Sequence, residues 1–129
     1  MKKYTGIVKF IAEHDNTYGN ITVEINFDEK LKDNQSVNEV IKEMVEFWAG
    51  YESLVNHFEG DYVKAFLKNL CCKILGMLVE YPFADEERMI ELMSKEEGYC
   101  SLDGSFGITL VDFEEMNFSD EADYTIKEV

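Results

Sequence analysis

Residues 20–28, NITVEINFD, alternate between apolar and polar side chains with a period of two. An extended chain points successive side chains to opposite faces, so this stretch predicts a half-buried strand. Its apolar face consists of Ile21, Val23, Ile25 and Phe27. Residues 4–11, YTGIVKFI, are rich in β-branched and aromatic residues and predict a strand before it. A polar loop with a glycine joins the two runs, which indicates an antiparallel hairpin.

A helix is expected directly after this hairpin. Ser36 and Glu39 have the spacing of a capping box, and apolar residues follow them at helical intervals. Their inner face would consist of Val37, Val40, Ile41, Met44, Trp48 and Tyr51. The pattern predicts a helix to about Ala49, and it leaves open an extension through Gly50 towards Phe58.

Two more helices are predicted in the middle of the chain. Residues 61–81 are apolar over a broad face, with Asp61 as the expected N-cap, and Pro82 ends the helix. A shorter helix is expected from near Asp85 to Gly98, with acidic residues in its first turn. Its inner face would consist of Met89, Leu92 and Met93.

The C-terminal third returns to strand-like patterns. Asp103-Gly104 lies between two such runs and predicts a hairpin turn. Residues 123–129, DYTIKEV, could add a last strand with Tyr124 and Ile126 facing inward. The predicted order is β-β-α-α-α-β-β, with that optional final strand. We therefore expect a single α+β domain over residues 1–129, with an antiparallel sheet of two hairpins packed on one face by about three helices.

The chain is strongly acidic, with a formal net charge of −15 over 129 residues. Residues 1–79 hold 12 acidic and 9 basic side chains, whereas residues 80–129 hold 15 acidic and 3 basic ones. Such a field repels phosphate backbones and anionic lipid, which disfavours direct binding of nucleic acid or membranes. It would attract a basic protein, or it could serve solubility alone.

Targeting and redox features are sparse. The N-terminal residues 1–10 lack a signal-peptide core, and the longest apolar stretch, residues 70–79, is too short to span a bilayer. Three cysteines without metal-type spacing indicate reduced thiols. A cytoplasmic protein is therefore expected.

No motif for catalysis, a metal or a cofactor is present. Cys71 falls within an apolar helix face, which favours a role in the core over a redox role. His14 and His57 have no partner at zinc-ligand spacing. A nucleophile pair of Cys100 with either histidine has no local support, and a weak calcium site among loop carboxylates remains an alternative. We therefore expect no enzyme and no cofactor.

The acidic C-terminal half supplies the candidate partner-binding residues. They are Glu114, Glu115, Asp120, Glu121 and Asp123. Apolar residues interleave with them and could either dock onto the domain or form a patch for a partner. These apolar residues are Phe113, Met116, Phe118, Tyr124 and Ile126.

The function itself cannot be determined from the sequence. The first hypothesis is a small non-enzymatic interaction module that binds a basic protein surface. The chain's size, acidity and excess of lysine over arginine resemble those of short proteins encoded by phages and mobile elements, although no motif carries the likeness. A sharper variant is a nucleic-acid mimic, which would need carboxylates fixed on rigid elements. Glu39, Glu43 and Glu46 of the first helix, together with Asp112 to Asp123, are candidates.

The alternative function is a ligand-binding domain or enzyme with a pocket between sheet and helices. Trp48, Tyr51, His57 and Cys100 are its candidate lining residues. Self-association as a homo-oligomer is compatible with either hypothesis.

Overall fold

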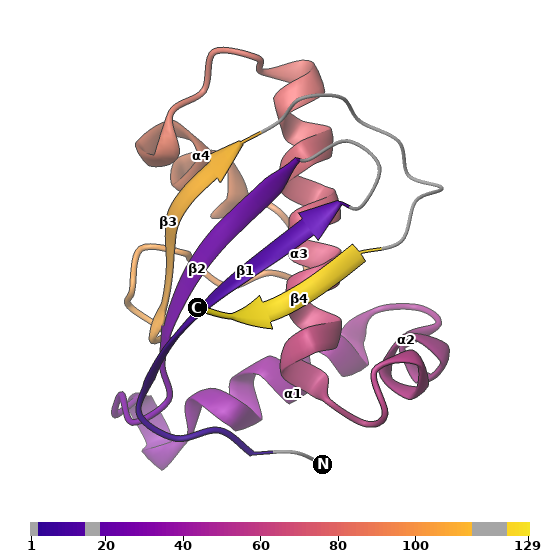
Figure 1. Cartoon of the computed structure of the whole chain (residues 1–129). Coiled ribbons are helices and arrows are strands. Elements are labelled where there is room, and N and C mark those ends of the chain that lie inside the picture. The colour runs from indigo at the N-terminus through magenta and orange to yellow at the C-terminus, as the bar shows by residue number, and fades with distance from the viewer. Residues whose placement is uncertain (1–2, 15–18, 115–123) are drawn as a thin grey trace.

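The computed structural model describes residues 3–14, 19–114 and 124–129, and it shows an α+β domain built on one antiparallel sheet. The strands are β1 (Ile7–His14), β2 (Asn20–Asn26), β3 (Ile108–Glu114) and β4 (Tyr124–Glu128). Their order across the sheet is β3-β2-β1-β4 (Figure 1). The predicted fold class and order of elements are confirmed.

The N-terminal hairpin forms the centre of the sheet. Ala12 pairs with Ile21 and Phe10 with Val23, so the alternating apolar residues of both strands share one face. That face is buried, whereas Thr22 and Glu24 of β2 lie on the other, partly exposed face. β1 begins three residues later than predicted because Gly6 takes a positive φ of 73°, which turns residues 4–6 out of the strand.

The helices are α1 (Val37–Phe47), α2 (Tyr51–His57), α3 (Tyr62–Glu80) and α4 (Glu86–Met93), preceded by a short 3-10 turn, Lys32–Asn34. They lie on one side of the sheet (Figure 1). α3 runs behind the strands and contacts β1, β2 and β4, and α1 packs against α3. The expected packing on one face is therefore present, with four helices where about three were predicted.

Helix starts follow the predicted caps at α1 and α3, and α4 starts next to Asp85, near which a helix was expected to begin. The side chains of Ser36, Asp61 and Asp85 accept hydrogen bonds from backbone N–H groups of α1, α3 and α4. Gly50 has a left-handed φ of 76° and separates α1 from α2, which resolves the open extension as a break. α4 ends at Met93, five residues before the glycine that was expected to end it.

The C-terminal hairpin is shorter than the sequence indicates. Leu110 N–H donates to the Leu102 carbonyl, and a single bridge joins Asp103 to Thr109. The turn spans residues 104–107, with Ser105 and Phe106 at its centre, so the prediction of Asp103-Gly104 as the central pair is wrong by two residues and Asp103 pairs with Thr109 instead. β3 then pairs with β2, whereas the last strand, β4, pairs with β1, so the two C-terminal strands occupy opposite edges.

Apolar side chains fill the space between the sheet and the helices. Phe10, Ile21, Phe66, Leu70 and Ile74 are each at most 1% exposed and belong to one continuous cluster. Such burial supplies most of the stability of a domain of this size. Within the described residues, no helix has the length and apolar character needed to cross a membrane.

Candidate interaction surface

Three carboxylates form a row along the exposed side of α1. Glu39, Glu43 and Glu46 are spaced four and three residues apart, which places them on one face of the helix. The row spans roughly 10 Å at 1.5 Å of rise per residue. All three side chains are exposed to solvent.

Neutral donors hold each carboxylate of this row, which we call the α1 acidic row. Ser36 Oγ donates to Glu39 at 3.0 Å, and Gln35 Nε2 donates to Glu43 at 2.8 Å. The Tyr62 hydroxyl donates to Glu46 at 3.2 Å. In a capping box the N3 carboxylate is expected to reach the N-cap N–H, but here Glu39 accepts from the hydroxyl of Ser36 instead. The row is therefore ordered without losing its negative charge.

No ion pair involves this row among the residues that the structure describes, although Lys42 lies at neighbouring positions of the same helix, three residues after Glu39 and four before Glu46. Lys42 is the only basic residue of α1, and its Nζ lies 5.9 Å from the centre of the Tyr62 ring. None of the ion pairs in the described part of the chain involves Glu39, Glu43 or Glu46.

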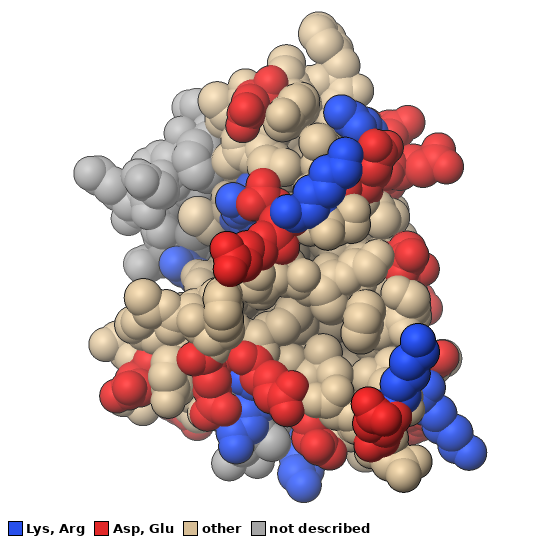
Figure 2. Space-filling view, turned by 180° about the vertical axis from the view of Figure 1, so that it is seen from behind, with Lys and Arg blue, Asp and Glu red and all other residues tan. Residues whose placement is uncertain are grey.

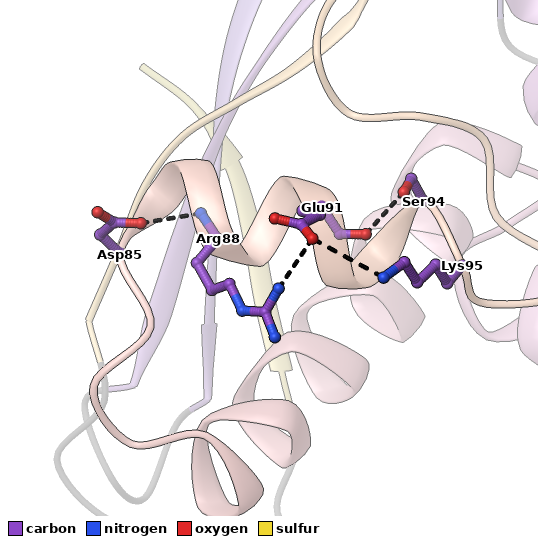
Figure 3. A network of polar contacts seen from close by, with 5 residues as sticks. All are labelled: Asp85, Arg88, Glu91, Ser94 and Lys95. Atoms are coloured by element: carbon purple, nitrogen blue, oxygen red, sulfur yellow. Dashed lines mark hydrogen bonds and ion pairs between the residues drawn. The ribbon is translucent and has the colours of Figure 1, made fainter.

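α4 shows the opposite arrangement (Figure 3). Glu91 pairs with Arg88 at 2.9 Å and with Lys95 at 3.8 Å, while Ser94 Oγ donates to the Glu91 carbonyl. Asp85 is occupied as the N-cap, accepting from Arg88 N–H. The acidic residues on α4 are thus partly balanced locally, and the α1 acidic row carries the more available charge.

A groove borders this row. It has a volume of about 510 Å³ and opens to solvent between α1 and the segment 97–106. The groove is largely open to solvent, so it is a shallow hollow of the surface and not an enclosed ligand pocket. The residues that line it are Gln35, Val40, Glu43, Met44, Phe47, Glu97, Gly98, Tyr99, Cys100 and Phe106. They include two carboxylates and neither lysine nor arginine.

Trp48 anchors the segment that forms the far wall of the groove. Its indole Nε1–H donates to the Gly98 carbonyl at 3.1 Å, and its ring lies 5.2 Å from that of Tyr99. The ring also stacks on Phe66 of α3. Met44 contributes from α1, since its Sδ lies 3.2 Å from Cys100 N. The wall is thereby fixed to the core, while the groove between remains open.

Gly98 makes this close approach feasible. Its φ of +87° is a conformation that L side chains rarely adopt, and a Cβ there would lie 3.0 Å from Trp48 Nε1. A side chain at this position would push the wall away from Trp48. The glycine that was expected to end a helix instead permits the contact that shapes the groove.

Two aromatic side chains keep the groove apolar at its surface. Phe47 is 63% exposed and Phe106 is 40% exposed, although both are large hydrophobic residues. Figure 2 shows the face of the molecule that carries the helices, where red carboxylates and blue basic side chains lie beside one another above and below an uncharged band. An apolar groove beside ordered carboxylates suits a partner that is both cationic and apolar.

Of the four residues predicted to line an internal pocket, only Cys100 lines this groove. Cys100 lines the groove, but Trp48 packs inward, and Tyr51 and His57 are not among the groove residues. His57 is exposed on α2 and contacts the ring of Phe58. The side chain of His14 lies outside the described residues. The geometry therefore offers no Cys100–His57 pair at the groove.

Burial favours the neutral form of two thiols, those of Cys71 and Cys100. Cys71 is fully buried and its Sγ donates to the Ala12 carbonyl at 3.4 Å, so its predicted place in the core is confirmed. Burial raises the pKa of Cys71 to about 12 and that of Cys100 to about 12. A thiol with such a pKa is a poor nucleophile at neutral pH. In the described part of the chain, no cluster of three metal-ligating side chains occurs.

Most of the candidate residues in the C-terminal half lie outside the described residues. The candidate acidic residues outside the described part are Glu115, Asp120, Glu121 and Asp123. The apolar residues Met116 and Phe118 and the side chain of Tyr124 also lie outside it. Glu114 is described, and it is exposed at the end of β3. Phe113 and Ile126 pack against the core, so these two members of the apolar set dock onto the domain.

The α1 acidic row can be read from the sequence, whereas the groove beside it cannot. Phe47 gave a signal, because it is an aromatic residue on the polar side of an amphipathic helix. Glu97 and Phe106 gave none, because their place opposite α1 depends on the path of the chain after α4. The groove forms only because the fold brings together residues that are fifty or more positions apart in the sequence.

Comparison with known proteins adds a family but no activity. A family model described as "Protein of unknown function (DUF2528)" matches residues 20–126, which include β2, all four helices and β3. No curated protein and no solved structure matches the chain.

Proposed function

The chain belongs to the DUF2528 family, and we propose that it is a small, non-enzymatic interaction module that binds a basic protein surface. The observation that carries the proposal is the α1 acidic row, in which three exposed carboxylates are oriented by neutral donors and have no cationic partner among the described residues. The net charge of −15 also favours a positively charged partner.

Order in the row matters for recognition. A carboxylate already held by a hydrogen bond loses less conformational freedom on binding than a free glutamate does. Charge-assisted hydrogen bonds from arginine or lysine could then form at the remaining acceptor positions. The α1 acidic row would therefore contribute specificity as well as faster association.

A nucleic-acid mimic is the sharper form of this proposal. The row has one charge per roughly 5 Å along α1, compared with one per ~3.4 Å along a single DNA strand. If the partner normally binds nucleic acid through the same basic surface, duplex DNA should compete with this chain. If DNA and the chain bind together, the partner is basic but the mimicry is wrong.

The test begins by isolating a partner and ends with purified components. The chain is used to capture proteins from its source cells, and each captured protein is purified and titrated against it by calorimetry at 50 and 300 mM NaCl. We expect a partner whose affinity falls steeply with salt. An affinity that does not change with salt would overturn the proposed electrostatic mode.

Variants then locate the binding surface. The first variant, E39Q/E43Q/E46Q, keeps the side-chain shapes and the capping box but removes three charges from α1. The second, E114Q/E115Q/E121Q, removes three charges from the predicted C-terminal site. The control, E52Q/E80Q/E87Q, removes three exposed charges elsewhere. The control changes the net charge by the same amount as the first variant. We therefore expect the first variant to lose at least about tenfold more affinity than the control, because only the first variant alters the proposed site. Equal losses in all three would show a diffuse charge effect without a site.

A further inference from the structure

We propose that the groove between α1 and the segment 97–106 receives an apolar side chain of the partner, flanked on the partner by lysine or arginine. This inference rests on the proposed function for the charge of the partner, but the apolar anchor is a separate claim. It identifies the occupant as a basic protein segment with an exposed aromatic or large aliphatic residue.

The composition of the groove supports an apolar anchor. Val40, Met44, Phe47 and Phe106 supply hydrophobic walls, and the adjoining Tyr99 ring is fixed against Trp48. Hot spots of protein interfaces have this character, since an aromatic or aliphatic anchor fills a preformed pocket and excludes water there. Phe47 and Phe106 remain 63% and 40% exposed, which leaves their apolar surface available.

The carboxylates at the rim of the groove favour a partner with positive charge. Glu43 stands on the α1 side and Glu97 on the opposite wall, and both are exposed. A basic residue on each side of the anchor could therefore meet a carboxylate. The rest of the α1 acidic row, Glu39 and Glu46, extends the same field along the helix.

Other occupants fit the groove less well. A second copy of this chain would bring its own charge of −15 to an acidic rim, so like charges would oppose the contact. Nucleic acid and anionic lipid meet the same repulsion. Charge complementarity thus favours a cationic protein segment.

A second apolar feature provides a matched control. Phe83, in the turn between α3 and α4, is 99% exposed and adjoins a separate hollow of about 360 Å³. That hollow is lined by Glu80 and Arg88 together with four neutral residues, so its charge is mixed. Replacing Phe83 removes exposed apolar surface without touching the groove.

Two defined peptides test the inference by NMR titration of the full chain. Both have lysines on either side of one central position, which is phenylalanine in the first peptide and serine in the second. We expect the first peptide to bind at least about tenfold more tightly and to shift the resonances of Met44, Tyr99 and Phe106. Equal affinities of the two peptides, or shifts confined to other surfaces, would overturn the inference.

Variants separate the anchor from the charge. F47S/F106S should abolish the preference for the phenylalanine peptide, whereas F83S should keep it. E39Q/E43Q/E46Q should weaken both peptides and preserve their ratio. If the phenylalanine preference survives F47S/F106S while E39Q/E43Q/E46Q still weakens binding, the groove is wrong and the charged surface stands. If E39Q/E43Q/E46Q has no effect on either peptide, the proposed function fails instead.

Discussion

Asp61 shows how a single residue joins three parts of the molecule. It is 5% exposed and is the one buried charged side chain in the described part of the chain. It accepts from Val63 and Lys64 N–H as the N-cap of α3, and it also accepts from the hydroxyl of Tyr4 at 2.5 Å. Tyr4 in turn stacks on Phe27, at the end of the N-terminal hairpin. One carboxylate therefore links the central helix to the residues that lead into β1.

We expect D61A to destabilise the protein by about 3 kcal/mol. The loss combines an N-cap, worth ~1 kcal/mol, with the charged hydrogen bond from Tyr4, worth roughly 2 kcal/mol. Urea unfolding followed by circular dichroism measures it. D85A is the matched control, because Asp85 caps α4 at the surface and should cost only about 1 kcal/mol. Equal losses in the two variants would show that the Tyr4 contact adds nothing.

The buried thiol of Cys71 makes a prediction about pH. Its folded pKa, about 12, lies above the ordinary value of 9.0 because burial disfavours the thiolate. The neutral thiol therefore adds stability that is complete below pH 9 and is lost as the pH rises towards 12. At pH 8 only roughly one thiol in ten thousand would be ionised.

A thiol-reactive chromophore checks this expectation at pH 8. Wild type and C71A should show the same number of reactive thiols when folded, and wild type should show one more in urea. A folded wild-type protein that reacts at one more thiol than C71A would contradict the burial of Cys71. This readout also separates core packing from a redox role.

Elements were predictable where short-range chemistry determines them. The alternation of residues 20–28 produces β2 directly, and the three side-chain caps give the starts of α1, α3 and α4. The C-terminal ends of the helices were harder to predict, because tertiary contacts determine them. At the end of α4, Ser94 Oγ donates a hydrogen bond to the Glu91 carbonyl. The chain after α4 then places the ring of Tyr99 against that of Trp48. No local pattern in the sequence indicates that contact.

β4 makes a prediction at the scale of a whole element. It is an edge strand of five residues, and Ile126 is 9% exposed on the core side, where it pairs with Ala12. I126A should therefore cost about 2 kcal/mol in the free energy of unfolding. V129A, next to the same strand and 72% exposed, should change it by less than ~0.5 kcal/mol.

Thermal and urea unfolding of both variants distinguish a docked strand from a loosely attached one. A similar small effect in the two variants would show that β4 adds little to stability. In that case the core would be closed by β1, β2 and β3 without it.

At the scale of the whole molecule, the fold leaves a filled core and an open groove on its helical side. The sequence predicted the class of fold, because helical and strand patterns are well separated along the chain. It also named Glu39, Glu43 and Glu46, whose spacing is readable in one helix. The groove was not predictable, because one wall comes from residues 35–47 and the other from residues 97–106. The C-terminal acidic residues Glu115 to Asp123 remain a prediction.

We propose that the α1 acidic row and the groove beside it form one surface for a basic partner. Hydrogen–deuterium exchange of the chain, free and bound to a purified partner, tests this claim most directly. We predict that binding slows exchange in residues 97–106 and at the ends of α1, and that E39Q/E43Q/E46Q removes this protection. Protection confined to the edge strands β3 and β4, with residues 97–106 unchanged, would show that the partner binds elsewhere on the molecule.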